Sequence, residues 1–208
     1  MLECIMVVNT SNKVIIITGN KLIAKNLEKN YRFRNTMIIY DNSSKFARGF
    51  KLLKNRKLST FNVIKMYLAQ FDRNSHKRIS NGVTRIKNEL EFVKIIDSYQ
   101  PSHVISFHCG MIFHTSLYSQ KILMLNIHCA SLPQYPGIGA IINAISDKSV
   151  IQNATMHKII SKIDYGEIVK TKSFKLNFSK SYKANYQKSI SVGIDLLREY
   201  MSELNLNS

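Results

Sequence analysis

The stretch VIIITGNKLIAKNLEKNYRFRNTMIIYD, residues 14–41, decides the fold. It opens with a β-branched run at 14–18 that Gly19 closes, and this pattern is typical of a buried strand. A short helix is expected at 21–30. A second apolar run at 35–41 ends in a polar residue and is expected to be another strand. Strand, helix and strand in this order predict a parallel sheet with a crossover helix.

The remaining chain continues the alternation of strands and helices. Further strands are expected at 102–110 (SHVISFHCG), at 121–128 (KILMLNIH), and twice within 154–176, around the turn Asp164-Tyr165-Gly166. Between 84 and 101, apolar side chains recur at spacings of three and four and predict an amphipathic helix that starts near Thr84 and ends at Pro101: Ile86, Leu90, Val93 and Ile96. A last amphipathic helix is expected from Ser181 onward.

These elements predict an α/β fold, an open, mostly parallel twisted sheet with flanking helices and a Rossmann-like core. The 208 residues suit one domain. We therefore expect residues 1–208 to form a single catalytic domain, with 177–208 as a C-terminal helical tail. Open sheets of this type bind ligands at the carboxyl ends of their strands.

The charge of the chain is strongly positive. Thirty Lys and Arg stand against 13 Asp and Glu, which gives a formal net charge of +17. Basic residues crowd between Lys45 and Lys87, where Asp72 is the one acid. Such a field attracts anionic ligands, including nucleic acid or a nucleotide diphosphate. The alternative is a lysine-rich composition that reflects an AT-rich genome.

Other features limit the class of protein. No apolar run reaches the 18 residues that a membrane span needs, so no spanning helix is expected. The opening residues lack the basic start of a secretion signal. The three cysteines, Cys4, Cys109 and Cys129, show no paired metal-ligand spacing. We expect a cytoplasmic protein without a bound metal.

The chemistry concentrates at Asn126 and His128. They are two residues apart at the end of an apolar run, so in a strand both side chains face the same way. A loop with two prolines and two glycines follows, at 131–139. Asn126 can donate an amide N–H without charge, and His128 can donate or move a proton near neutral pH. The alternative is a hydrogen-bonded structural histidine.

Two segments carry a family resemblance. NIHCASLPQYPG, residues 126–137, resembles the N-I-H-P-S-L-L-P-x-Y-x-G signature of the 10-formyltetrahydrofolate-dependent formyltransferases. ATMHKIISKIDYGEIV, residues 154–169, is similar to that family's G-V-T-I-H-x-x-D-x-x-I-D-x-G-x-I-I. His157 falls on the His of this pattern, and Asp164 falls on the Asp before x-G. The two motifs stand in the family's order.

The resemblance implies a one-carbon transferase whose formyl donor is 10-formyltetrahydrofolate. It assigns the catalytic roles to Asn126, His128 and Asp164. It also implies that the folate contacts the residues Gly110, Met111, Ile112, His157 and Ile163. Formyl transfer to an amine passes through a tetrahedral oxyanion, which needs a hydrogen-bond donor and an acceptor for the proton of the amine.

The chain departs from the family pattern at several positions. Cys129-Ala130 replaces Pro-Ser, and Lys162 stands where an acid or Gly is usual. Cys129 beside His128 suggests a thiol nucleophile as an alternative, but adjacent strand residues face opposite ways. His108, Cys109 and His114 suggest a metal site, but no matching ligand pair exists, and a folate-pocket loop is preferred there.

Within the family, the second motif is most similar to the sugar N-formyltransferases. The usual acceptor of that group is a dTDP-linked 4-amino-4,6-dideoxy sugar such as dTDP-4-amino-4,6-dideoxyglucose, used for surface polysaccharide (O-antigen, lipopolysaccharide). The stretch 19–22 (GNKL) lacks the G-S-G-S phosphate loop of phosphoribosylglycinamide formyltransferase. We expect the residues Lys77, Arg78 and Asn81 to bind the diphosphate of the substrate.

Three alternatives remain open. They are phosphoribosylglycinamide formyltransferase, 10-formyltetrahydrofolate hydrolase, and a basic nucleic-acid-binding protein on a decayed enzyme scaffold. The preferred partners are a nucleotide-sugar and folate rather than nucleic acid. The oligomeric state stays open, with a homodimer as one alternative.

Overall fold

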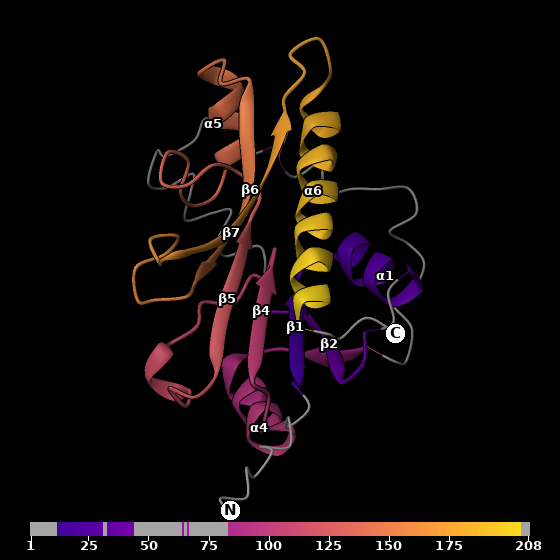
Figure 1. Ribbon diagram of the computed structural model, residues 1–208, viewed down its shortest axis with the longest axis vertical. Coiled ribbons are helices and arrows are strands. Elements are labelled where there is room, and N and C mark those ends of the chain that lie inside the picture. The colour runs from indigo at the N-terminus through magenta and orange to yellow at the C-terminus, as the bar shows by residue number, and fades with distance from the viewer. Residues whose placement is uncertain (1–11, 31–32, 44–63, 65, 67–82, 205–208) are drawn as a thin grey trace, which may run out of the picture.

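A computed structural model describes residues 12–30, 33–43, 64, 66 and 83–204. Its strands form one sheet in the order β3-β2-β1-β4-β5-β6-β7 (Figure 1). The strands are β1 (Val14–Thr18), β2 (Thr36–Asp41), β3 (Thr84–Ile86), β4 (His103–Phe107), β5 (Leu123–His128), β6 (Ile151–Lys158) and β7 (Ile168–Lys175). The helices are α1 (Lys21–Asn30), α4 (Glu89–Tyr99), α5 (Ala140–Ser146) and α6 (Tyr182–Glu203), with a 3-10 turn η2 (Thr115–Leu117).

The sheet is parallel from β3 to β5 and antiparallel from β5 to β7. Helices flank both of its faces. The predicted α/β class, an open and mostly parallel sheet with flanking helices, is confirmed. Because the parallel strands end at one edge, their carboxyl ends form a single rim where side chains from distant parts of the sequence meet.

The core lies on both faces of β1, whose five residues are all buried. Ile15 and Ile17 face α4, where they pack with Phe92. Val14 and Ile16 face the opposite side, where α1 and α6 cover the sheet. Figure 1 shows α6 running along this face. Burial on both faces explains why β1 is an unbroken β-branched run rather than an alternating one.

An antiparallel hairpin, β6 and β7, extends the sheet beyond β5. The register pairs Asn126 of β5 with His157 of β6. The connection between β6 and β7 turns tightly at Gly166, where a Cβ atom would lie 1.8 Å from the carbonyl oxygen of Lys158. Only glycine fits there, and the turn folds residues 159–167 back over the carboxyl end of β5.

The helix predicted to start near Thr84 begins five residues later. Thr84–Ile86 is instead the edge strand β3, and the prediction of helix for these residues was wrong. The cause is local: the side chain of Asn88 accepts a hydrogen bond from the N–H of Glu91 and caps the helix at that point. The predicted apolar stripe is also shifted, since Phe92 and Ile96 are buried whereas Leu90 is 69% exposed.

Helix α6 approaches the sheet very closely at Gly193. A Cβ atom there would lie 2.6 Å from the ring of Phe107 and 3.4 Å from the sulfur of Cys129. The absent side chain therefore sets the distance between the helix and strands β4 and β5. In the part of the chain that the structure describes, no helix is long and apolar enough to cross a membrane.

Candidate active site

A row of polar side chains crosses three strands at the carboxyl rim of the sheet. The register places Ser106 of β4, Asn126 of β5 and His157 of β6 side by side. Ser106 and Asn126 lie on the same face of the sheet as Val104 and Met124, which pack with Phe92 and Ile96 of α4. A cavity of about 340 Å³ opens above the row.

The β6–β7 connection brings Asp164 onto this row. Its carboxylate Oδ1 accepts a hydrogen bond from Asn126 Nδ2 at 3.4 Å and lies 3.3 Å from His157 Nε2. The backbone of Asp164 is left-handed, with φ of 60°, a conformation that costs energy for any residue with a side chain. Such strain is typical of residues that a site holds in place.

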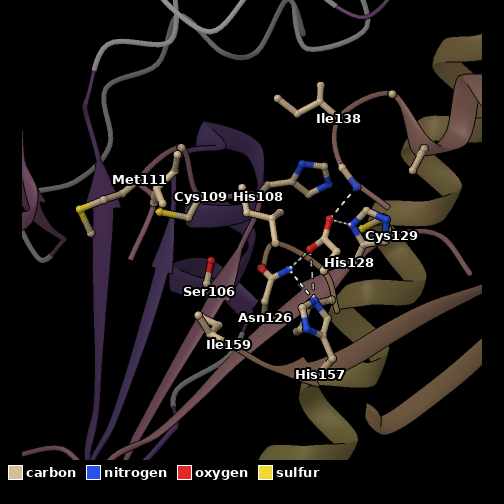
Figure 2. A pocket seen from close by; sticks show the side chains of 18 of the residues that line it. Ser106, His108, Cys109, Met111, Asn126, His128, Cys129, Ile138, His157 and Ile159 are labelled. Atoms are coloured by element: carbon tan, nitrogen blue, oxygen red, sulfur yellow. Dashed lines mark hydrogen bonds and ion pairs between the residues drawn. The ribbon is translucent and has the colours of Figure 1, made fainter. Parts of the chain in front are cut away.

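His128 stands on the other side of the same carboxylate. Its Nε2–H donates to the carbonyl oxygen of Tyr135 at 2.7 Å, and its Nδ1 lies 3.4 Å from Asp164 Oδ2. The N–H of Gly137 donates to that same Oδ2 at 2.7 Å. The loop after β5 therefore returns to form hydrogen bonds with both His128 and Asp164. Figure 2 shows Asn126, His128 and His157 converging.

Within this row, His157 orients the side chain of Asn126. Its Nδ1–H donates to the carbonyl of Lys158 at 3.0 Å, which leaves Nε2 to accept from Asn126 Nδ2 at 3.1 Å. The residue is only 2% exposed. Both hydrogens of the Asn126 amide nitrogen are thus engaged, the shorter bond with His157 and the longer one with Asp164.

Asp164 and His128 differ in protonation, because their surroundings favour an ionised carboxylate on Asp164 and a neutral imidazole on His128. Burial alone would raise the pKa of Asp164, but the adjacent His157 imidazole, the nearby His128 ring and the hydrogen bond from the Gly137 N–H outweigh it and lower that pKa. Burial lowers the pKa of His128 below its usual 6.5, although the Asp164 carboxylate and the Tyr135 carbonyl oppose the change. At neutral pH the pair is therefore a carboxylate and a neutral ring, which together can take up one proton.

The residues expected to contact folate all line the same cavity. These are Gly110, Met111 and Ile112, which follow β4, and His157 and Ile163 of the second motif. Ile112 and Ile163 are more than half exposed, so the rim of the cavity is apolar. The three predicted substrate contacts, Lys77, Arg78 and Asn81, lie outside the described residues, and their role stays a prediction.

The structure argues against both a thiol nucleophile at Cys129 and a metal site at His108, Cys109 and His114. Burial raises the pKa of Cys129 to about 12, so its thiol is protonated and not a nucleophile at neutral pH. The ring of His114 pairs with Glu89 rather than with a cysteine. Among the described residues, no group of three or more His, Cys, Asp or Glu side chains could hold a metal ion.

Sequence reasoning missed several residues of the site. The motif contains Tyr135 and Gly137, but it did not signal that the Tyr135 carbonyl and the Gly137 N–H contact the site, because both act through the backbone of the loop. Tyr182 and Tyr186, at the start of α6, also line the cavity. Their rings stack with centroids 5.9 Å apart. Only their spacing of four, one helical turn, could have pointed to a shared face.

Comparison with known proteins assigns the family. Residues 12–197 match the formyl transferase family, so the chain belongs to it. Its members are formyltransferases that use 10-formyltetrahydrofolate as formyl donor. At the level of the family, the predictions of family, enzyme class and formyl donor are confirmed.

The curated relatives act on different acceptors. The chain is 28% identical over 184 residues to a phosphoribosylglycinamide formyltransferase of Dictyostelium discoideum, covering 80% of this chain and 84% of that protein. It is 28% identical over 111 residues to a methionyl-tRNA formyltransferase of Fervidobacterium nodosum, covering 53% of this chain. The match spans only 36% of that enzyme's length.

Solved structures share the fold across the same classes. A phosphoribosylglycinamide formyltransferase from Streptococcus pneumoniae TIGR4 aligns with a TM-score of 0.64 at 15% identity, over 93% of this chain and 98% of that one. A sugar 3N-formyltransferase solved in the presence of dTDP and 5-N-formyl-THF aligns with a TM-score of 0.58 at 15% identity, over 95% of this chain and 65% of that one. These likenesses define the fold, and they leave the acceptor open between classes.

Proposed function

We propose that this chain transfers a formyl group from 10-formyltetrahydrofolate to the amino group of a nucleotide-linked amino sugar. The observation that carries formyl transfer is the convergence of Asn126, His128 and Asp164 at the floor of one cavity. An amide donor, a neutral imidazole and a carboxylate are the groups that this reaction needs.

The reaction moves one proton and one acyl group. The amine nitrogen attacks the formyl carbon, a C–N bond forms, and the bond from that carbon to folate N10 breaks. The amine loses one proton and the departing N10 gains one. The pair of His128 Nδ1 and Asp164 Oδ2, 3.4 Å apart, is suited to hold that proton between the two events.

Asn126 is suited to stabilise the oxyanion. Its amide hydrogen toward Asp164 spans 3.4 Å, whereas the bond to His157 is 3.1 Å. The longer and weaker bond is the one that a developing oxyanion can replace. His157 then keeps the amide oriented, because its Nδ1–H is fixed on the carbonyl of Lys158.

The preference for a nucleotide-sugar over a phosphoribosyl acceptor rests on the turn after β1. Asn20 caps α1 with its own side chain: Oδ1 accepts from the N–H of Leu22 at 2.9 Å and of Ile23 at 3.4 Å. Free amides at a helix N-terminus are what a phosphate binds. With two of them engaged, this turn is poorly suited to the phosphate of phosphoribosylglycinamide.

Phosphoribosylglycinamide remains the second candidate acceptor, because the curated relative from Dictyostelium discoideum matches this chain over most of both lengths. The role in surface polysaccharide synthesis and the dTDP carrier are parts of the nucleotide-sugar proposal.

One assay separates the candidates. Purified protein is mixed with 10-formyltetrahydrofolate and, in turn, dTDP-4-amino-4,6-dideoxyglucose, phosphoribosylglycinamide, methionyl-tRNA or no amine, and tetrahydrofolate release is followed. Turnover that depends on the amino sugar supports the proposal. Turnover with another amine moves the assignment to that acceptor, and amine-independent turnover indicates a hydrolase. No turnover at all contradicts a formyltransferase activity.

A further inference from the structure

A buried carboxylate outside the row of Ser106, Asn126 and His157 forms hydrogen bonds with one wall of the cavity. Asp41, the last residue of β2, is 1% exposed. Its Oδ2 accepts hydrogen bonds from the N–H of Gly110 at 2.7 Å and of Met111 at 2.9 Å. The thiol of Cys109 donates to the same oxygen at 3.3 Å, and the N–H of Ser43 donates to Oδ1 at 2.8 Å.

This contact crosses the sheet. Strands β2 and β4 are not neighbours, because β1 lies between them. The carboxylate passes the end of β1 at Gly19, where a Cβ atom would lie 3.2 Å from the His108 carbonyl oxygen and 3.4 Å from Gly110 N. The absence of a side chain at Gly19 therefore leaves room for the loop after β4 to reach Asp41.

The loop that Asp41 holds is the wall of the cavity. Cys109, Gly110 and Met111 all line it, and Figure 2 shows Cys109 and Met111 beside the catalytic row. The far end of the loop is held separately by Glu89. That carboxylate accepts from the His114 N–H at 2.7 Å and from the Tyr118 hydroxyl at 2.7 Å.

An ionised carboxylate is the group that suits these four donors. Burial alone would raise the pKa of Asp41, but the hydrogen bonds from Ser43, Cys109 and Gly110 outweigh it and lower that pKa. An asparagine at this position would turn an NH₂ group toward either Ser43 N–H or the three donors on the loop. The negative charge thus fixes two successive peptide units of the wall.

We propose that Asp41 is a positioning residue for the formyl donor: it sets the path of the 109–111 wall against which 10-formyltetrahydrofolate binds. This inference rests on the proposed formyl transfer. Asp41 contacts neither Asn126 nor Asp164 in any hydrogen bond of the described residues, so its loss is expected to weaken donor binding and to spare the chemistry.

The test is Asp41→Asn, with binding and kinetics measured on the same preparation. The Kd of 5-formyltetrahydrofolate, measured by calorimetry without an amine, should rise about tenfold or more, which corresponds to about 1.4 kcal/mol. The KM for the formyl donor should rise with it. The KM for the amine should stay within a factor of two, and the midpoint of the pH–rate profile should not move.

Two variants complete the design. Gly19→Ala presses on the same wall from the other side and should reproduce the selective loss even where Asp41→Asn fails to fold. Asp97→Asn, at an exposed carboxylate on α4, is the matched control and should change nothing. Unchanged folate affinity in a folded Asp41→Asn or in Gly19→Ala would overturn the inference, as would equal losses for donor and amine.

The failure of this inference is distinguishable from the failure of the proposed function. If the unaltered chain does not bind the folate, formyl transfer itself is contradicted. If the unaltered chain binds it and the two variants bind it equally well, only the role of Asp41 is contradicted.

Discussion

At the scale of single residues, the site depends on a carboxylate with four partners, one of which is His157. Asp164 contacts His128, Asn126 and the N–H of Gly137 at once. The sequence motif predicted that the first two would meet Asp164, because the family resemblance carried all three positions. The motif includes Gly137 but could not predict its contact with Asp164, because the contact is made by a backbone N–H; the φ of 79° explains why a glycine suits this position.

The first prediction concerns the catalytic pair. His128→Ala and Asp164→Ala should each lower kcat by about 10²-fold or more, the usual effect of removing a positioned acid–base group. The Kd of 5-formyltetrahydrofolate should change far less. His103→Ala, at the amino end of β4, is the control and should leave kcat unchanged. Near-normal kcat in both site variants would show that the roles are wrongly assigned.

The second prediction concerns pH. Since burial lowers the pKa of His128, the ring is neutral at pH 7, and kcat/KM should be flat near neutrality and fall in acid, below pH 6.5. The Asp164 carboxylate opposes that lowering, so Asp164→Asn should move the titration of His128 to still lower pH. NMR of the His128 ring from pH 4 to 8 measures this in both proteins. A midpoint that rises in Asp164→Asn would contradict the coupling.

At the scale of elements, hydrophobic patterns predicted strands β1 and β2 but missed strand β3, which lies directly before helix α4. The β-branched run of β1 and the polar end of β2 predicted strands, and both exist. Strand β3 was missed because its Ile86 continues, by spacing, the apolar pattern of α4. Only the pairing with β2 and the cap at Asn88 separate the two elements, and neither is visible in hydrophobic periodicity.

The third prediction belongs to the packing of α6. Gly193→Ala places a Cβ atom 2.6 Å from the fully buried ring of Phe107. Overpacking of this kind costs about 1–3 kcal/mol, whereas alanine in place of glycine favours a helix by about 1 kcal/mol. The net effect should be a loss of about 1 kcal/mol in the free energy of unfolding, measured by urea denaturation. Ser191→Ala, exposed on the same helix, should not destabilise. A Gly193→Ala protein as stable as the original would refute the close packing.

At the scale of the whole molecule, the site is assembled by contacts between segments that are far apart in sequence. The bond from Gly110 to Asp41 joins residues 69 apart, and the bond from Asn126 to Asp164 joins residues 38 apart. The second was predictable, because two motifs of one family carry its partners. The first was not, since a single Asp at the end of a strand has no pattern that distinguishes it from other strand ends.

The last prediction concerns the charge of the molecule. The formal net charge is +17, and the basic stretch between Lys45 and Lys87 is where we expect two phosphates of a nucleotide-sugar to be neutralised. Lys77→Ala or Arg78→Ala should raise the KM for the nucleotide-sugar and leave the KM for folate unchanged. One charge-assisted bond is worth about 1.5–3 kcal/mol, so the rise should be roughly ten- to a hundred-fold.

Lys121→Ala, at an exposed lysine just before β5 and so at the amino end of the sheet, is the matched control and should change neither KM. Higher salt should also raise the KM for the nucleotide-sugar, because part of the attraction acts over a distance and is screened. If both single variants keep that KM within a factor of two, the phosphates bind elsewhere. A KM that ignores salt would point to backbone amides as the phosphate site, and the positive charge would then reflect composition rather than substrate.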